Sequence, residues 1–193
     1  MITLLFTLMK RILLVLWLLA SSYTGLQAQR TAVRTNLLFW GTTTPNAGVE
    51  FSLGCKFTLA LDGGYNAWEF SNDMKLNLAF AQPEFRYWFC RRFEGHFIGL
   101  HGHYAHFNIG QIDFIPCMKE YVYRGNLYGG GLSYGYHWAL GKRWGMEVTV
   151  GGGYAQLSYD KYLCRDCGER VGRFKRTYFG PTRAGVSLIY FLR

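Results

Sequence analysis

The sequence predicts an all-β fold, an eight-stranded antiparallel transmembrane β-barrel that follows an N-terminal signal peptide. Eight segments alternate apolar and polar residues with a period of two, the spacing of a strand with two unlike faces. Aromatic residues make up 18% of the 193-residue chain, which also has 24 glycines, and this composition suits a barrel better than a soluble core. The last segment, residues 183–193, alternates up to the end of the sequence in a pattern similar to an outer-membrane assembly signal.

The N-terminal segment has the three parts of a secretory signal peptide. Lys10 and Arg11 precede an apolar run over residues 12–20, and Leu26-Gln27-Ala28 forms a small-residue cleavage site. A permanent helical anchor is the alternative, but nine apolar residues are fewer than the roughly 20 needed to cross a bilayer. We therefore expect a signal peptide over residues 1–28 and a barrel domain over residues 29–193, with Met1 and Met9 both open as the start.

The eight predicted strands follow one another along the mature chain. In the first, Val33 and Leu37 share one face and Arg34 lies on the other. The later strands repeat this division, and their apolar faces carry no charge. The segments are residues 30–40, 47–54, 57–65, 84–89, 98–104, 128–138, 146–154 and 183–193.

The predicted connections alternate between short and long. Tight turns are expected at residues 54–56, 91–95 and 141–143, and longer loops at 66–75, 108–125 and 158–175, while the connection near Pro45 is a short exception. Short turns of such barrels face the periplasm and long loops face the exterior. This orientation places Trp88, Trp138, Trp144 and Tyr190 at the periplasmic ends of strands, as an interfacial aromatic girdle.

A soluble, lipocalin-like barrel is the main alternative fold. Its strands would carry apolar residues inside and polar residues outside. Here the charges and most glycines share the face opposite the aromatic and aliphatic residues, which favours a barrel in the outer membrane of a Gram-negative bacterium.

Acidic and basic residues share the face that we assign to the barrel lumen. Eight strands enclose little more than side chains, so these residues should pair and plug the lumen. A conducting pore is the alternative. The predicted lumen charge network comprises Arg34, Glu50, Asp62, Glu84, Arg86, Glu147 and Arg183.

Two motifs resemble metal sites, and we assign neither of them a metal. His101 and His103 share a strand face, but His106 has the opposite parity, so lumen hydrogen bonds are the favoured role. Cys164 and Cys167 lack a second ligand pair, and an exported loop more readily forms a disulfide, from one of them to Cys117.

The remaining cysteines lie near predicted periplasmic turns. Cys55 and Cys90 have opposite parities in their strands, which argues against a direct cross-strand disulfide.

Net charge limits the classes of partner. The formal charge falls from +9 to +7 when Lys10 and Arg11 leave with the signal peptide. The last long loop has a surplus of three positive charges, from Lys161, Arg165, Arg170, Arg173, Lys175 and Arg176 against Asp160, Asp166 and Glu169. In an exported barrel these cations meet lipopolysaccharide phosphates rather than nucleic acid, although a simply solvated basic loop remains an equal alternative.

Catalytic and cofactor motifs are absent from the sequence. The glycine triplets at residues 129–131 and 151–153 complete neither a dinucleotide site nor a P-loop, so they predict bends in strands. His106 and Ser158 meet the exposure condition for a lipid-modifying hydrolase but lie on nonadjacent strands. We assign no catalytic residue and no cofactor.

Several sequence words are similar to those of an uncharacterised outer-membrane barrel family of anaerobic Gram-negative bacteria. They are Thr35-Asn36-Leu37-Leu38-Phe39-Trp40, Thr44-Pro45-Asn46 with Glu50, Gly64-Tyr65-Asn66-Ala67-Trp68, Pro83-Glu84-Phe85-Arg86-Tyr87-Trp88 and Gly95-His96-Phe97. The resemblance implies an OmpA-like barrel architecture and an association with fimbria-type surface loci.

The expected function is non-enzymatic: a structural or surface-interaction role that includes assistance to fimbria assembly. The expected partners are outer-membrane lipids including lipopolysaccharide, the barrel assembly machinery and surface-filament components. A small-solute or ion channel is the first alternative, and a lipid-modifying enzyme is the second.

Overall fold

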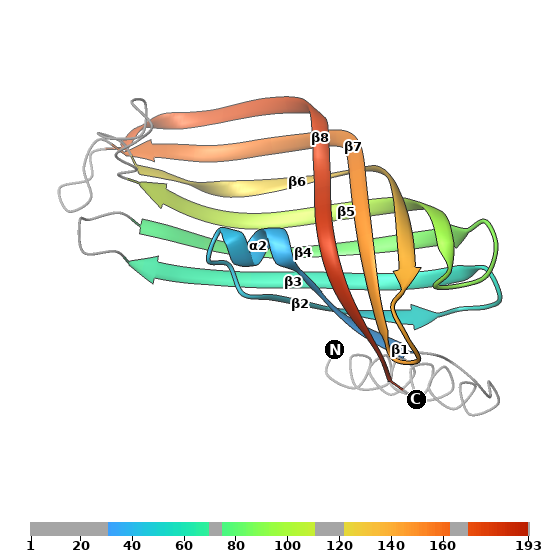
Figure 1. Cartoon of the computed structure of the whole chain (residues 1–193). Helices are drawn as coiled ribbons and strands as arrows, with labels where there is room; N and C mark the ends of the chain where they lie inside the picture. The colour runs from blue at the N-terminus through green and yellow to red at the C-terminus, as the bar shows by residue number, and fades with distance from the viewer. Residues whose placement is uncertain (1–30, 70–74, 111–121, 163–169, 193) are drawn as a thin grey trace, which may run out of the picture.

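The computed structural model describes residues 31–69, 75–110, 122–162 and 170–192, which form one antiparallel sheet (Figure 1). Each strand pairs with its sequence neighbours, and β8 pairs back with β1, so the sheet closes in a ring. The strands are β1 (Thr31–Asn36), β2 (Asn46–Ser52), β3 (Phe57–Glu69), β4 (Lys75–Trp88), β5 (Gly95–Gly110), β6 (Val122–Ala139), β7 (Trp144–Tyr162) and β8 (Arg170–Leu192). The prediction of an all-β fold with eight antiparallel strands is confirmed. The predicted signal peptide lies outside the described residues.

One short helix, α2 (Leu37–Gly41), connects β1 to β2. No helix in the described ranges has the length and apolar composition needed to cross a membrane.

The prediction of a strand over residues 30–40 is wrong at its C-terminal end, because β1 stops at Asn36. Residues 37–40 are four consecutive apolar residues without β-branching, so they cannot alternate faces and they tolerate a helix well. The Asn36 side chain caps this helix by accepting a hydrogen bond from the Leu38 amide at 3.1 Å. Asn36 also donates to the Ala184 carbonyl at 3.2 Å and accepts from the Val186 amide at 3.2 Å, which ties the start of α2 to β8.

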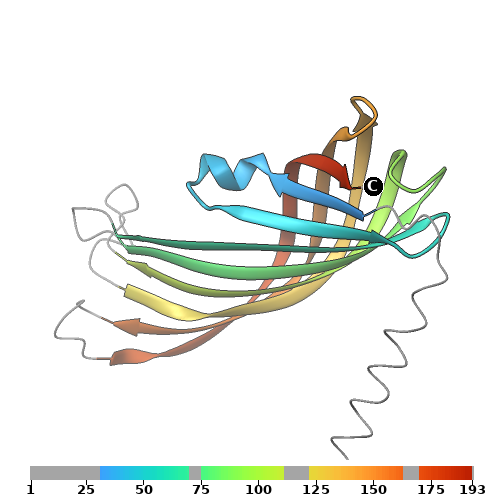
Figure 2. The same ribbon diagram turned by 90° about the horizontal axis from the view of Figure 1, so that it is seen from below.

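The predicted long loops are wrong at their ends, because strand pairing continues through the parts of residues 66–75, 108–125 and 158–175 that the structure describes. β5 and β6 stay in register from Gly95↔His137 to Gly110↔Val122, and β7 and β8 pair from Trp144↔Tyr190 to Tyr162↔Arg170. Residues 111–121 and 163–169 lie outside the description. Figure 2 shows the strands from β3 to β8 continuing well past α2 as one curved layer.

The strands differ in length, and within the described residues the sheet closes at one end only. β1 pairs with β8 as far as Asn36↔Ser187, and β2 pairs with β3 as far as Asn46↔Gly64. We call the closed part the ring. The part of β3 to β8 that continues beyond it is the extension, and it starts at the register row Gly64–Phe80–Ala105–Leu127–Leu157–Arg176.

The two glycine triplets lie beside each other on β6 and β7, where Gly131 pairs with Gly153. A Cβ added at either of these two glycines would lie 2.2 Å from a backbone oxygen of the facing strand. Figure 1 shows β6, β7 and β8 turning sharply midway along their lengths. The close backbone approach agrees with the prediction of bends at these triplets, since only glycine permits it.

Candidate functional site

All seven residues of the predicted lumen charge network lie together inside the ring. Their side chains point inward from β1, β2, β3, β4, β7 and β8. Arg86 is fully buried and reaches Glu50 and Glu147, each at 2.9 Å, and it also pairs with Glu84 on its own strand. The other ion pairs are Arg34 with Asp62 (3.0 Å), Glu147 (3.0 Å) and Glu50 (3.3 Å), and Arg183 with Asp62 (2.7 Å) and Glu84 (3.1 Å).

Neutral side chains complete the hydrogen bonding of the buried carboxylates. Thr58 donates to Glu50 at 2.6 Å, Thr149 donates to Glu147 at 2.8 Å, and Ser133 donates to Glu84. These hydroxyl groups satisfy oxygen atoms that the arginines leave free, which is the condition under which buried charges are tolerated. They share the inward parity of the charges, but the sequence alone gave no signal for their specific partners.

An apolar cluster closes the interior on the side of the network nearest the tight turns. It comprises Ala32, Trp88, Phe93, Phe97 and Ile189, which are all buried. The Phe97 ring lies 4.4 Å from the guanidinium carbon of Arg86, close enough for a cation–π contact. Trp88 donates from its indole to Thr58 at 2.9 Å.

The prediction of Trp88 as an interfacial aromatic is therefore wrong. Trp88 shares its parity with Glu84 and Arg86, and this alternation was the signal that it belongs inside. Trp138 and Trp144 are exposed on the outer surface, and the Trp144 ring contacts Tyr190 at a centroid distance of 4.9 Å.

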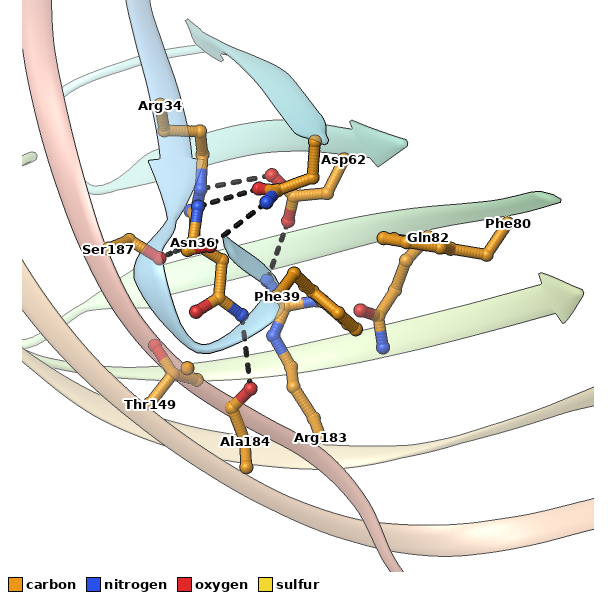
Figure 3. Close-up of a pocket in the computed structure, with 12 residues that line it drawn as sticks. Arg34, Asn36, Phe39, Asp62, Phe80, Gln82, Thr149, Arg183, Ala184 and Ser187 are labelled. Carbon is orange, nitrogen blue, oxygen red and sulfur yellow. Dashed lines mark hydrogen bonds and ion pairs between the residues drawn. The ribbon is translucent and has the colours of Figure 1, made fainter. Parts of the chain in front are cut away.

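On the other side of the network, α2 places Phe39 against Phe80 of β4, with ring centroids 4.6 Å apart. Between this aromatic pair and the charges lies a cavity of about 20 Å³, which is lined by Arg34, Asp62, Gln82 and Arg183 among others (Figure 3). Such a volume holds about one water molecule. The interior is thus filled from the Trp88 cluster to Phe39.

The histidines of β5 divide between the two faces. His101 is buried inside and its Nε2 atom lies 2.9 Å from the Thr182 hydroxyl. The ring of His103 lies 5.8 Å from that of His101 on the same face. His106 is exposed outside, and its Nδ1 atom lies 2.8 Å from the Asn126 side-chain oxygen. No group of three or more metal-ligating side chains gathers within the described ranges.

The cysteine predictions separate into described and undescribed positions. Cys55 and Cys90 are free and exposed near the tight turns. Cys117, Cys164 and Cys167, the residues of the predicted loop disulfide, lie outside the described residues.

Exposed aromatic residues on the outer surface form two bands. The first contains Trp138 and Trp144 near the tight turns. Tyr128 lies ten residues from Trp138 on β6, and Tyr154 lies ten residues from Trp144 on β7. The second band, which the sequence did not predict, consists of Tyr65, Tyr104, Tyr128, Tyr154 and Phe179. Between the bands the outer face is aliphatic and aromatic, as shown by Leu59, Leu100, Leu132 and Val150.

Beyond the second band, the outer face of the extension is polar. Here a pocket of about 360 Å³ is lined by His106, Arg124, Gly125, Asn126, Ser158, Tyr159, Asp160, Arg173 and Lys175. Arg173 pairs with Asp160 at 3.2 Å, and Arg124 donates to the Asn108 side chain at 3.3 Å. His106 and Ser158 therefore share one surface pocket, although β6 separates their strands.

Comparison with known proteins gives a family. No curated protein matches the chain. The family model described as "Protein of unknown function (DUF3575)" matches residues 12–192, nearly the whole chain. The chain belongs to the DUF3575 family.

Proposed function

We propose that this DUF3575 protein is a non-enzymatic β-barrel of a Gram-negative outer membrane with a plugged lumen. Its proposed role is structural or in surface interaction, and assistance to the assembly of surface filaments such as fimbriae belongs to that role. Outer-membrane lipids including lipopolysaccharide, the barrel assembly machinery and surface-filament components are the proposed partners.

The two aromatic bands support the membrane placement. Ten residues of strand extend over about 34 Å, and a tilt of about 40° reduces this to a height of about 26 Å. This height matches the apolar band of an outer-membrane barrel, roughly 25 Å tall and bordered by aromatic girdles. The exposed aliphatic residues between the bands would be a poor surface in water and are a suitable surface in lipid.

The filled interior is the single observation that carries the non-conducting role. Three arginines and four carboxylates pair across the ring, an apolar cluster lies on one side of them, and Phe39 lies on the other. A ring of eight strands has an interior about as wide as its side chains, so this packing of the described residues supports a plugged lumen over a conducting one.

Heat-modifiable gel mobility of the refolded mature protein, followed by planar-bilayer conductance on the same preparation, tests this proposal. We expect a compact band that shifts on heating and no steady conductance. Steady single-channel conductance would instead support the small-solute or ion channel. Absence of any heat-dependent shift would contradict the membrane barrel itself.

The shared outer pocket of His106 and Ser158 favours one further candidate, a lipid-modifying enzyme. The Nδ1 atom of His106 lies 2.8 Å from the side-chain oxygen of Asn126. This contact orients the imidazole ring but places no negative charge beside it. Lipid A hydrolysis by the wild-type protein and its loss in His106→Ala would support this candidate, whereas hydrolysis retained in His106→Ala would remove its basis.

A further inference from the structure

One edge of β8 has no paired strand over most of its length in the described part of the chain. The pairing with β1 covers only residues 187–192, and Asn36 caps Ala184 and Val186. Residues 170–183 pair with β7 alone. On the opposite side of this opening, β4 is the only described strand that pairs with β3 beyond Gly64, although the Tyr65 amide donates to the Pro45 carbonyl. The backbone groups along the free edge of β8 can therefore accept another strand.

The face of the sheet that carries the apolar residues differs between the ring and the extension. In the ring, charges face inward and apolar residues face outward. In the extension, one inner register row reads Asn66–Leu78–Phe107–Gly125–Tyr159–Phe174. The adjacent outer row reads Ala67–Asn77–Asn108–Arg124–Asp160–Arg173. The inner face of the extension is thus mainly apolar, as a soluble sheet is toward its core.

Both the inner and the outer residues of β8 are exposed along its free edge. Residues 173–179 are all exposed, although the sheet continues on their β7 side. Phe174, Arg176 and Tyr178 belong to the inner face, where two aromatic rings flank one cation, and the Phe174 ring stacks on Tyr159 at 5.8 Å. Arg173, Lys175 and Thr177 belong to the outer face. A strand added here would place its side chains beside these two sets in alternation.

We propose that the free edge of β8 binds an extended segment of a partner protein by strand addition. The segment alternates apolar residues, which face inward beside Phe174 and Tyr178, with acidic residues, which face outward beside Arg173 and Lys175. Main-chain hydrogen bonds supply affinity and the alternating side chains supply specificity. This inference deepens the proposed surface-interaction role and rests on it.

The positive charge of the β8 edge favours an acidic segment of a partner protein over a second copy of the chain. The edge carries Arg173, Lys175 and Arg176, so two β8 edges placed side by side would bring cations against cations. Lipid is also a poor occupant, because acyl chains offer no partner to backbone N–H and C=O groups. An acidic segment satisfies both the backbone and the cations.

Titration of the refolded full-length mature protein with a fluorescent peptide tests the proposal. The probe alternates valine with glutamate and is as long as the free edge, and anisotropy measures its binding. Hydrogen exchange on the same complex reports protection of residues 173–179. We expect saturable binding, slowed exchange at these residues, and affinity that falls at high salt because the charges are exposed.

Two peptide controls separate the sources of affinity. Methylation of every second amide nitrogen removes main-chain donors along one edge and keeps the side chains, so binding should be lost. Replacement of glutamate by lysine should weaken binding by at least about tenfold. Equal binding of either control peptide would overturn the proposal.

A matched pair of protein variants locates the site. Lys175→Glu should weaken binding several-fold, whereas Lys142→Glu, in a tight turn at the opposite end of the sheet, should leave it unchanged. Absence of peptide binding would overturn the proposal. So would slowed hydrogen exchange in β8 without peptide, if it increased with protein concentration, as for a second copy, or on addition of lipid vesicles. Heat-modifiable mobility and conductance are measured on the same sample, so a folded, non-conducting protein that fails to bind contradicts strand addition alone.

Discussion

The ring and the extension are built from the same strands but place their polar residues on opposite faces. On β7, Glu147 and Thr149 point into the ring, whereas Leu157 and Tyr159 point inward in the extension. Side chains alternate with a period of two in both regions, so this alternation alone does not decide which face is polar. The ring has a polar interior and an apolar exterior, which agrees with the membrane placement that we propose, and the extension has the polarity expected of a sheet in water.

The largest expected effect comes from a change at the centre of the ring network. Arg86→Met removes the cation that pairs with Glu50, Glu84 and Glu147, and it leaves buried carboxylates without their main counter-charge. We expect the free energy of unfolding to fall by about 3–5 kcal/mol. Urea titration of the refolded protein in lipid vesicles measures this. A loss below about 1 kcal/mol would show that the network contributes little to the ring.

A smaller effect should follow from a charge on the outer side of the ring, which we propose faces lipid. Leu132 is 69% exposed between the two aromatic bands, so Leu132→Arg should cost about 2–4 kcal/mol in vesicles. Asn126→Arg, on the outer face of the same strand in the extension, should cost no more than about 1 kcal/mol, because it removes only exposed hydrogen bonds to His106 and Tyr104. Equal costs at the two positions would break the distinction between ring and extension.

The bend between the two regions should respond at an intermediate level. Gly131→Ala places a Cβ 2.2 Å from the Gly152 carbonyl oxygen, and the backbone of β7 must shift to relieve the clash. A cost of about 1–3 kcal/mol is expected. Gly102→Ala is the control, because its added Cβ would meet atoms no closer than 3.8 Å. Comparable unfolding midpoints for the two variants would argue against tight packing at the bend.

The sequence predicted the ring better than the extension, for a physical reason. Arg34, Glu50 and Arg86 stood out because each charge alternates with apolar residues along its strand, and the period of two then placed the charges on the face opposite those residues. The same rule, applied strictly, would also have placed Trp88 inside. Parity gives the face of a residue, but it does not give its partners across the ring, so contacts such as Thr58 with Glu50 required the structure.

Strand limits failed where the polarity pattern changed. The sequence places polar residues at outer positions where a membrane strand would carry apolar ones, and such segments resemble loops. These residues include Asn108, Arg124 and Asp160. Their inner neighbours Phe107 and Tyr159 kept the period of two, with its sense inverted. The prediction at helix α2 failed for a different reason. A short, unbroken run of apolar residues has no periodicity that would distinguish a helix from a strand.

The smallest expected effect tests the extension by the same chemistry as the first variant tests the ring. Arg173 pairs with Asp160 at 3.2 Å, but 65% of its side chain is exposed. Water solvates both partners, so Arg173→Met should change the free energy of unfolding by less than about 1 kcal/mol. The change should shrink further in high salt, because exposed charges are screened. An effect as large as that of Arg86→Met would mean that the extension buries its charges as the ring does, which would remove the contrast between the two regions.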